Sequence, residues 1–392
     1  MRDKHVYILG KPGMGKSTLM LSMIRQDILN GKGVALIDPH GDLAESVLRH
    51  IPRERIQDTV YFNPLVTPIG INLFKASTEE EKRLIAGDLF LIFQRLTGTG
   101  GVRMDAVIKR AIQLLLEIPG ATFHDLYRLF TDDYFRHQLV GRVQDEGLKD
   151  FWTKVWTKYP HPATEEPLVT RLSEFDSNKS LRSVLSTSSS LDFYSLIQQK
   201  RIFIANISKG LIGVDTSPIL GTLLVSQFQL AGFKQASLPE SKRVPCYLFI
   251  DEFQNFRTSA FNEIVIESRK YQLCLTLANQ ALDDLDTESK AIVDKCETNV
   301  FFRLVHADAK KFGSMVGQYI VDDLMNLNKF EAIVRPGKPN DSKKIPVERP
   351  PSPGKGFRQE IIEHTLRSYP PLPPSQVVAH VDDDVSAGLA PD

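Results

Sequence analysis

Short apolar runs alternate with amphipathic stretches at the start of the chain. The runs VYIL (6–9), GVALID (33–38) and TVYFNP (59–64) have the length and apolar content of strands. Between them, residues 18–29 and 42–51 carry apolar side chains at helical spacing. Strands that alternate with amphipathic helices predict a parallel sheet covered by helices on both faces.

The pattern changes in the middle of the chain. Four stretches there, at 80–96, 104–118, 123–130 and 165–175, have helical spacing, and none reads as a convincing strand. We therefore expect an all-helical domain over residues 78–195, inserted into the domain that contains the sheet.

Apolar strands resume after the insertion. They are expected at 201–207, 245–252, 273–280 and 298–305, and helices are expected between them at 221–236 and 261–271. The sheet-containing domain is thus predicted to have a first part at 1–77 and a second part at 196–333.

The last part of the chain has a different composition. Residues 334–392 are rich in proline and basic residues and poor in apolar ones. Such a composition favours a mobile linker and tail over a packed element.

Composition limits the class of protein. The chain has 392 residues, with 48 Lys and Arg against 48 Asp and Glu, so it has no overall positive field with which to hold a polyanion. Three cysteines without metal-binding spacing, Cys246, Cys274 and Cys296, fit reduced core thiols of a cytoplasmic protein. No stretch has the ~18–20 apolar residues of a membrane span, so no span is expected in this chain.

The clearest chemical signal is GKPGMGKST, directly after the first strand and directly before the first helix. It fits the P-loop pattern, in which backbone N–H groups at a helix N-terminus wrap phosphates. Lys16 would neutralise the β- and γ-phosphates and Ser17 would ligate Mg²⁺. The sequence therefore predicts binding of ATP and Mg²⁺. The expected nucleotide-binding residues are Gly10, Lys11, Pro12, Gly13, Met14, Gly15, Lys16, Ser17 and Thr18.

A second signal is YLFIDEF (247–253), an apolar strand that ends in two carboxylates. Asp251 could hold Mg²⁺ through water, and Glu252 could polarise an attacking water. The alternative is a strand that ends in a solvated acidic turn. Beside a P-loop, the second carboxylate favours hydrolysis over binding alone.

Two further polar residues follow at sites that suit phosphate chemistry. Gln280 ends the strand after Glu252, where it would lie beside the γ-phosphate, although it could instead cap a helix. Arg269 precedes that strand by about one helical turn and could act as an arginine finger toward a neighbouring subunit. A surface pair with Glu267 or Glu263 is the alternative for Arg269.

The segment DPHGD (38–42) ends the second strand and is expected next to the P-loop. Gly41 is interpreted as a turn residue and Asp42 as the N-cap of the following helix. His40 has no second metal ligand at a fitting spacing.

These motifs, together with NPL (63–65), LRSVLSTSSSLDF (181–193), NISKG (206–210) and ESRKYQLCLTLANQ (267–280), resemble the HerA and FtsK branch of additional-strand P-loop ATPases. The resemblance runs from about His5 to Gly317. It is strongest to conjugative coupling proteins and related ATPases of type IV secretion, the TraG, VirD4 and TrwB group.

The resemblance implies a RecA/HerA-like mainly parallel sheet with an inserted all-helical domain. It also implies a homo-hexameric ring that hydrolyses ATP between subunits and moves DNA through a central channel. In that family the arginine about eleven residues before the strand-end glutamine acts in trans, and Arg269 and Gln280 keep this spacing. The helical insertion and the loop from Ser208 to Thr216 are candidates for pore contacts.

The chain departs from the family pattern at its start, because neither the membrane anchor of coupling proteins nor the β-barrel of HerA precedes the P-loop. This leaves two interpretations: a cytoplasmic variant that a secretion-channel or relaxosome partner recruits to the inner membrane face, or a sequence that begins inside a longer protein.

Two other functions fit the same motifs. The chain could energise protein export through a type IV secretion channel, as ATPases of the VirB4 kind do, or act as a HerA-like DNA-processing ATPase. A purely structural ring is disfavoured, because it would need no water-activating carboxylate.

Overall fold

A computed structural model describes residues 4–97, 101–159, 161–187, 191–256, 265, 268–285 and 287–371. The chain divides into two compact units. The first combines residues 1–63 with 192–365, and the second combines residues 64–191 with 366–392. The second unit covers residues 64–191 where the helical insertion was expected at 78–195, and its first helix begins at Glu79.

A nine-stranded sheet forms the centre of the first unit, in the order β3-β4-β2-β5-β6-β1-β7-β8-β9. Strands β1 to β7 pair in parallel, and β8 and β9 add an antiparallel edge. The mainly parallel sheet is thus confirmed. The strands are β1 (Val6–Leu9), β2 (Gly33–Asp38), β3 (Thr59–Phe62), β4 (Ile202–Asn206), β5 (Cys246–Ile250), β6 (Leu273–Asn279), β7 (Thr298–Phe301), β8 (Glu331–Pro336) and β9 (Lys343–Pro346).

The strand order sets the distances between the motifs. Strand β6 lies between β1, which leads into the P-loop, and β5, which leads into Asp251 and Glu252. Strands β5 and β6 separate β2 from β1, so the expectation that residues 38–42 lie next to the P-loop is wrong. The segment lies beside the end of β5 instead.

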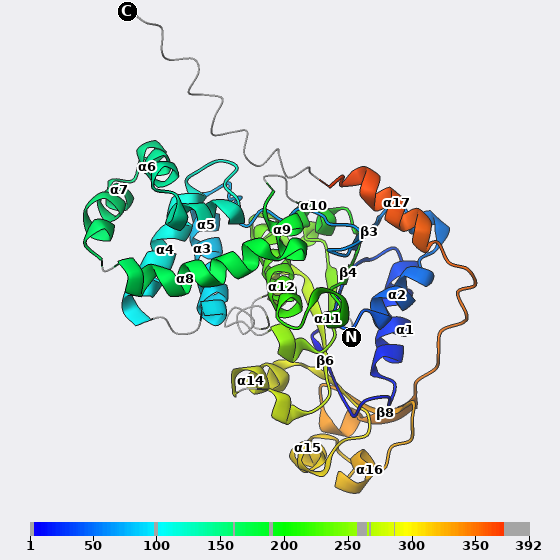
Figure 1. The fold of residues 1–392 in the computed structure, drawn as a ribbon. Helices are drawn as coiled ribbons and strands as arrows, with labels where there is room; N and C mark the ends of the chain where they lie inside the picture. The colour runs from blue at the N-terminus through cyan, green and yellow to red at the C-terminus, as the bar shows by residue number, and fades with distance from the viewer. Residues whose placement is uncertain are drawn as a thin grey trace, which may run out of the picture. The chain divides into compact units, whose positions relative to one another are not determined.

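Helices cover both faces of this sheet (Figure 1). Helices α1 and α2 lie together on one side, and α12 lies on the other. The connection from β1 to β2 through α1 and the connection from β4 to β5 through α12 run across the sheet in opposite directions. Right-handed crossovers therefore place α1 and α12 on opposite faces. The helices of the unit are α1 (Lys16–Leu29), α2 (Asp42–Arg49), α10 (Phe193–Gln198), α11 (Lys209–Ile212), α12 (Thr216–Lys234), α14 (Thr287–Lys295), α15 (His306–Phe312), α16 (Val321–Met325) and most of α17 (Arg358–Ser368).

Helix α12 is buried on nearly all sides, which explains its almost continuous apolar sequence. It packs against the short 3-10 helix η6 (Phe253–Phe256) that directly follows Glu252. A Cβ at Gly221 would lie 2.1 Å from the Phe256 ring, so the glycine makes this close packing possible. The core of the unit thereby supports the segment that carries Glu252.

From Glu79 onward the regular secondary structure described in the second unit is helical, as expected, and residues 64–78 before it form no helix. Phe123 packs one helix of this unit against two others, since the centroid of its ring lies 5.8 Å from the ring centroid of Phe93 and 5.6 Å from that of Phe175. None of the helices in the described part of the chain is long and apolar enough to span a bilayer. The helices of the unit are α3 (Glu79–Thr97), α4 (Gly101–Leu116), α5 (Phe123–Thr131), α6 (Asp133–Arg142), α7 (Glu146–Asp150), α8 (His161–Ser177) and α9 (Lys179–Leu185).

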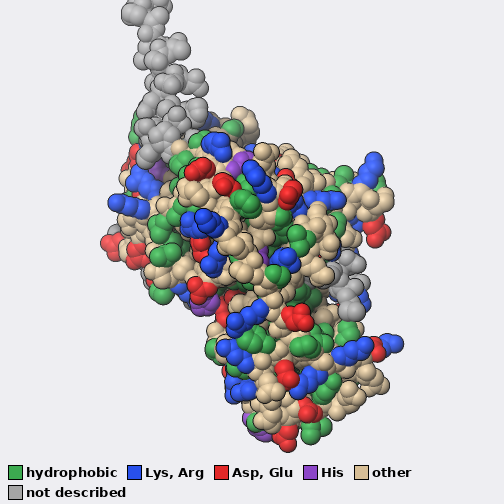
Figure 2. Space-filling model, turned by 90° about the vertical axis from the view of Figure 1, so that its right-hand side faces the viewer, with side chains coloured by type: hydrophobic (Ala, Val, Ile, Leu, Met, Phe, Trp, Pro, Cys, Tyr) green, Lys and Arg blue, Asp and Glu red, His purple; other side chains and the backbone are tan. Residues whose placement is uncertain are grey.

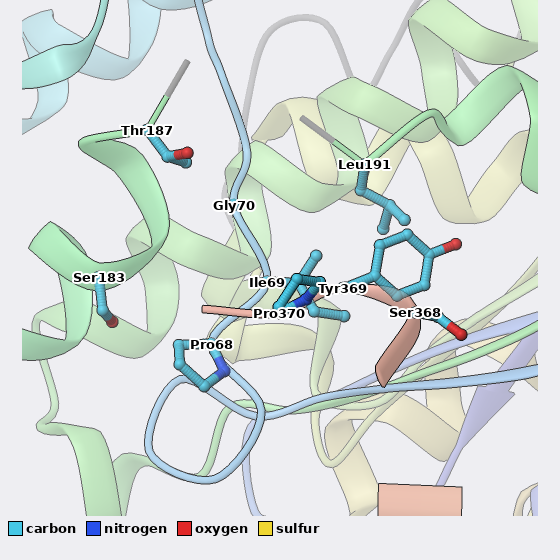
Figure 3. A pocket seen from close by; sticks show the side chains of 9 residues that line it. All are labelled: Pro68, Ile69, Gly70, Ser183, Thr187, Leu191, Ser368, Tyr369 and Pro370. Atoms are coloured by element: carbon cyan, nitrogen blue, oxygen red, sulfur yellow. The ribbon is translucent and has the colours of Figure 1, made fainter. Parts of the chain in front are cut away.

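A small cavity of about 120 Å³ lies within the second unit (Figure 3). Its walls come from residues 68–70, from α9 and the segment after it, and from residues 368–370. Figure 3 shows the Tyr369 ring close to Leu191. Residues 368–370 therefore line this cavity, with Tyr369 half-buried and Ser368 and Pro370 exposed.

The prediction that residues 334–392 form a linker is wrong for residues 334–371. This part contains the end of β8, all of β9 and helix α17. Helix α17 packs on the first unit, where the Thr365 hydroxyl accepts a hydrogen bond from the Tyr61 N–H of edge strand β3 at 3.2 Å. Proline content misled the sequence interpretation because the prolines either end a strand, as Pro336 and Pro346 do, or lie between or after these elements. Residues 372–392 lie outside the described part.

Arg358 anchors α17 to α2. Its guanidinium donates to both carboxylate oxygens of Glu45, with the shortest contact at 2.7 Å. The Tyr61 hydroxyl also donates to Glu45, at 2.9 Å. Although burial of Glu45 opposes ionisation, these bonds lower the pKa of its carboxyl group. The charged pair is thus part of the attachment of the C-terminal segment.

We predict that Arg358→Met lowers the free energy of unfolding by about 1 kcal/mol, because the lost ion pair is only half-buried. Urea unfolding measures this. Lys355→Met, at an exposed position nearby, is the control and should change stability by less than about 0.5 kcal/mol. Equal stability of the two variants would contradict the anchoring role.

Candidate functional site

The P-loop joins β1 to α1 at the centre of the sheet. Gly13 and Gly15 have φ values of 74° and 121°, a region that side chains strongly disfavour. A Cβ at Gly15 would also lie 2.9 Å from Phe330 Cδ1. The loop is held from its flank, since Phe330 N–H donates to the Met14 carbonyl and Lys11 N–H to the Arg303 carbonyl, both at 2.9 Å. The tertiary structure therefore fixes the loop conformation in advance.

Lys16 is the first residue of α1 and is only 7% exposed. Its ammonium donates to the Gly10 carbonyl at 2.6 Å, so the side chain folds back over the loop. Burial lowers the pKa of this group, and the nearby charges of Glu252 and Asp251 oppose the shift. Ser17 follows in the first helical turn and is exposed. A buried cation, an exposed hydroxyl and a helix N-terminus together suit an anionic phosphate.

Asp251 and Glu252 follow β5 directly, and both are 5% exposed. The Asp251 N–H donates to the Ile37 carbonyl at 3.1 Å, which continues the pairing of β5 with β2. Burial, with Asp38 and Glu252 nearby, raises the pKa of Asp251 to about 7. An excess of buried negative charge therefore faces Lys16.

The Glu252 carboxylate is held by two amides. Gln280 Nε2 donates to Oε1 and Gln254 Nε2 donates to Oε2, both at 2.7 Å. The backbone of Glu252 has a φ of 48°, which is rare for a residue with a side chain and costs about 1–3 kcal/mol. Strained conformations of this kind gather at functional sites. Gln280, predicted from its place at a strand end, thus directly contacts Glu252.

The position of Arg269 is described only in part. Its backbone lies in the 3-10 helix η7 (Ser268–Tyr271), just before β6, and its side chain lies outside the described atoms. Most of the helix expected at 261–271 also falls outside the described residues. The arginine-finger role of Arg269 therefore stays a prediction.

The sequence interpretation missed Asp38. Its carboxylate accepts hydrogen bonds from the N–H groups of His40 at 2.8 Å and Ala44 at 2.9 Å, so it caps α2 from the end of β2. The prediction that Asp42 is the N-cap is wrong, because Gly41 occupies that position with a φ of 89°. The turn role of Gly41 is confirmed. A carboxylate at the end of a strand was the available signal for Asp38.

The residues present fit a magnesium ion that also binds phosphate. Within the described part of the chain, no three carboxylate, histidine or cysteine side chains are grouped so as to bind a metal by themselves. Mg²⁺ needs fewer protein ligands, because it keeps several waters and uses phosphate oxygens. The exposed Ser17 hydroxyl and the buried Asp251 carboxylate, whose charge lacks full compensation, match that requirement.

Comparison with family models gives two matches. The model described as the central domain of helicase HerA matches residues 1–212, more than half of the 392 residues. The model described as the TraM recognition site of TraD and TraG matches residues 245–341. No curated protein matches the sequence. The resemblance seen in the motifs is thereby confirmed.

Solved structures show the same fold. The bacterial conjugative coupling protein TrwBdeltaN70 aligns with a TM-score of 0.64 at 16% identity, over 91% of this chain and 88% of that chain. TrwB in complex with the ATP analogue ADPNP gives 0.66 at 16% identity, over 90% and 86%. VirB4 of Thermoanaerobacter pseudethanolicus gives 0.65 at 16% identity, over 89% and 90%. The fold is therefore that of a P-loop NTPase with a mostly parallel sheet.

We predict that Gly15→Ala weakens nucleotide binding about tenfold or more, because the added methyl group meets Phe330 and the backbone is left-handed. Fluorescent-nucleotide titration measures this. Gly31→Ala is the matched control, since Gly31 has a φ of 69° but no atom within 4 Å of the added methyl. It should cost about 1 kcal/mol of stability and leave affinity unchanged. Equal affinities of both variants would contradict the role of the Gly15 packing.

Proposed function

The chain belongs to the family of the HerA helicase central domain, and from this premise we propose that it is an ATP-driven homo-hexameric motor that moves DNA in conjugative transfer or type IV secretion. The observation that carries the proposal is the grouping of Lys16, Glu252 and Gln280 at the carboxyl edge of β1, β5 and β6. This grouping combines a cation that can bind phosphate with a carboxylate that can polarise the attacking water, and ATP hydrolysis requires both.

ATP would bind along the P-loop, where the N–H groups after Gly10 and the start of α1 face the phosphates. Lys16 would exchange its bond to the Gly10 carbonyl for contacts with the β- and γ-phosphates. Ser17 and Asp251 would hold Mg²⁺, which would supply charge neutralisation on the phosphate oxygens. The similar protein TrwB has been solved in complex with ADP and Mg²⁺ and in complex with ADPNP, which supports this assignment.

Glu252 would orient the attacking water. Both of its carboxylate oxygens already accept amide hydrogen bonds, and an sp² oxygen has a second lone pair free to accept from water. Gln280, at the end of the neighbouring strand, would keep the Glu252 carboxylate in place and would also sense whether the γ-phosphate is present. The pair Glu252–Gln280 would thus couple the state of the nucleotide to the geometry of the water-binding group.

DNA is the proposed substrate because the matching family is named for a helicase and the similar TrwB is a conjugative coupling protein. Figure 2 shows basic and acidic side chains mixed over the visible face, in agreement with the net charge of zero. The grip on DNA phosphates would therefore come from local contacts in a ring channel, contributed by the helical insertion or by the loop from Ser208 to Thr216.

A protein partner is proposed for the second part of the motor unit. The model that matches residues 245–341 is named for recognition of TraM by TraD and TraG. A secretion-channel or relaxosome protein of this kind would recruit the motor from the cytoplasm to the inner membrane face.

Protein export is the second candidate function. VirB4 aligns as well as TrwB does, with TM-scores of 0.65 and 0.64. In that case the polymer moved by the ring is a polypeptide, and the phosphate chemistry is unchanged. HerA-like DNA processing is a variant of the first proposal in which the motor acts on DNA outside conjugative transfer.

The experiment that tests the function is the steady-state ATPase rate with and without single- and double-stranded DNA, together with the oligomeric mass. We expect hydrolysis stimulated by DNA and a hexameric mass. Lys16→Ala should lose nucleotide binding, and Glu252→Gln should bind ATP but hydrolyse it about 10²–10⁴-fold more slowly. If the wild-type protein is hexameric and DNA does not change its ATPase rate, protein export becomes the proposed function. Undiminished turnover by Glu252→Gln would contradict the role of that carboxylate.

We predict that Arg269 acts in a neighbouring subunit. Mixing Arg269→Ala subunits with wild type should lower activity more steeply than the mutant fraction, because one impaired site between neighbours would stop a ring whose sites act in sequence. Mixing with Lys270→Ala subunits, which alter the next side chain, is the control. A strictly linear decline for Arg269→Ala would mean that every site works alone.

A further inference from the structure

The backbone of Glu252 is held by a second set of contacts, distinct from those of its carboxylate. Asn255 contributes two donors to the Glu252 carbonyl oxygen, its own N–H and its Nδ2 amide, both at 2.9 Å. A carbonyl oxygen has two lone pairs, so one residue saturates it. These contacts close the turn that follows Glu252 and begins η6.

The Asn255 side chain is in turn fixed by a lysine from another part of the chain. Lys209 Nζ donates to Asn255 Oδ1 at 2.7 Å, across 46 residues of sequence. A charge-assisted bond to the oxygen orients the amide so that Nδ2 points to the Glu252 carbonyl. It also polarises the amide and strengthens the bond that Nδ2 donates.

The strand order makes this bridge possible. Strand β2 pairs with β4 on one side and β5 on the other, so the segments after β4 and β5 flank its carboxyl end. The segment after β4 is tied to that end, since Ile207 N–H donates to the Asp38 carbonyl at 3.1 Å and Lys209 N–H to the Pro39 carbonyl at 2.9 Å. Lys209 therefore reaches over the end of β2 from a fixed backbone.

We propose that Lys209 and Asn255 are positioning residues that hold Glu252 in its left-handed backbone conformation. A φ of 48° costs free energy, and the contacts around the residue must offset that cost. The Lys209–Asn255 pair provides such contacts without touching the carboxylate. The pair controls where the carboxylate lies, and with it the hydrolysis step, while nucleotide binding by the P-loop is independent of it.

The proposal deepens the proposed ATPase, on which its kinetic part rests. Lys209→Met removes the ammonium and keeps the length of the side chain. We expect kcat to fall about tenfold, a part of the ~10²–10⁴ that a positioned base contributes, with KM and nucleotide affinity unchanged. Lys209→Arg keeps a donor and should restore at least half of the lost rate. Lys242→Met, at an exposed lysine of the same unit, is the control and should behave like wild type.

Asn255→Asp separates the two halves of the bridge. The new carboxylate still accepts from Lys209, but it cannot donate to the Glu252 carbonyl. We expect a loss of kcat as large as that of Lys209→Met. The double variant Lys209→Met/Asn255→Asp should lose no more than the worse single variant, because both act through one contact.

Hydrogen–deuterium exchange of the 251–256 segment tests positioning without hydrolysis. Faster exchange in Lys209→Met, reversed in Lys209→Arg, at an unchanged melting temperature would support the proposal. Exchange and kcat like wild type, or a fall in melting temperature that accounts for the lost rate, would overturn it. If wild type hydrolyses no ATP, the proposed function fails, and the exchange of the 251–256 segment alone still decides whether Lys209 positions Glu252.

Discussion

The placement of β6 between β1 and β5 is the constraint on which the site depends. Parallel pairing brings the carboxyl ends of neighbouring strands to one edge, so a residue that ends β6 lies between the P-loop and the segment after β5. Gln280 holds that place and donates to Glu252. Had β1 and β5 been neighbours, the amide could not stand between the phosphate-binding loop and the carboxylate.

The same edge collects charges at a cost in free energy. Asp38, Asp251 and Glu252 are all buried there, and the buried ammonium of Lys16 lies near Asp251 and Glu252. Burial, together with the nearby charges of Asp38 and Glu252, disfavours ionisation of Asp251 and raises the pKa of its carboxyl group. Such an arrangement suits a protein that binds a cation and an anion together, because a metal ion at Asp251 would offset the negative charge and phosphates at Lys16 would offset the positive charge.

The backbone around the site is fixed by segments far away in sequence. Phe330 supports the P-loop, the Arg303 carbonyl accepts from the N–H of Lys11 in the same loop, and Lys209 holds Asn255 behind Glu252. Each of these contacts lies near the carboxyl ends of the parallel strands. The site is therefore built before any ligand arrives, which lowers the cost of ordering it on binding.

The sequence by itself determined the parts of the site that arise from local pattern. A glycine-rich loop between a strand and a helix, and a carboxylate pair after an apolar strand, specify their chemistry within a few residues, so Lys16, Ser17, Asp251 and Glu252 could be named in advance. The parallel sheet and the helical insertion followed from periodicity in the same way. What only the tertiary structure decided were the long-range pairings. Strand order placed residues 38–42 beside β5 and not beside the P-loop, and the proline-rich end of the chain packed as β9 and α17. The contact between Lys209 and Asn255 likewise depends on which strands are neighbours. Which strands are neighbours cannot be determined from a single sequence. The free energy that selects the strand order comes from burying whole faces of the helices and the sheet together.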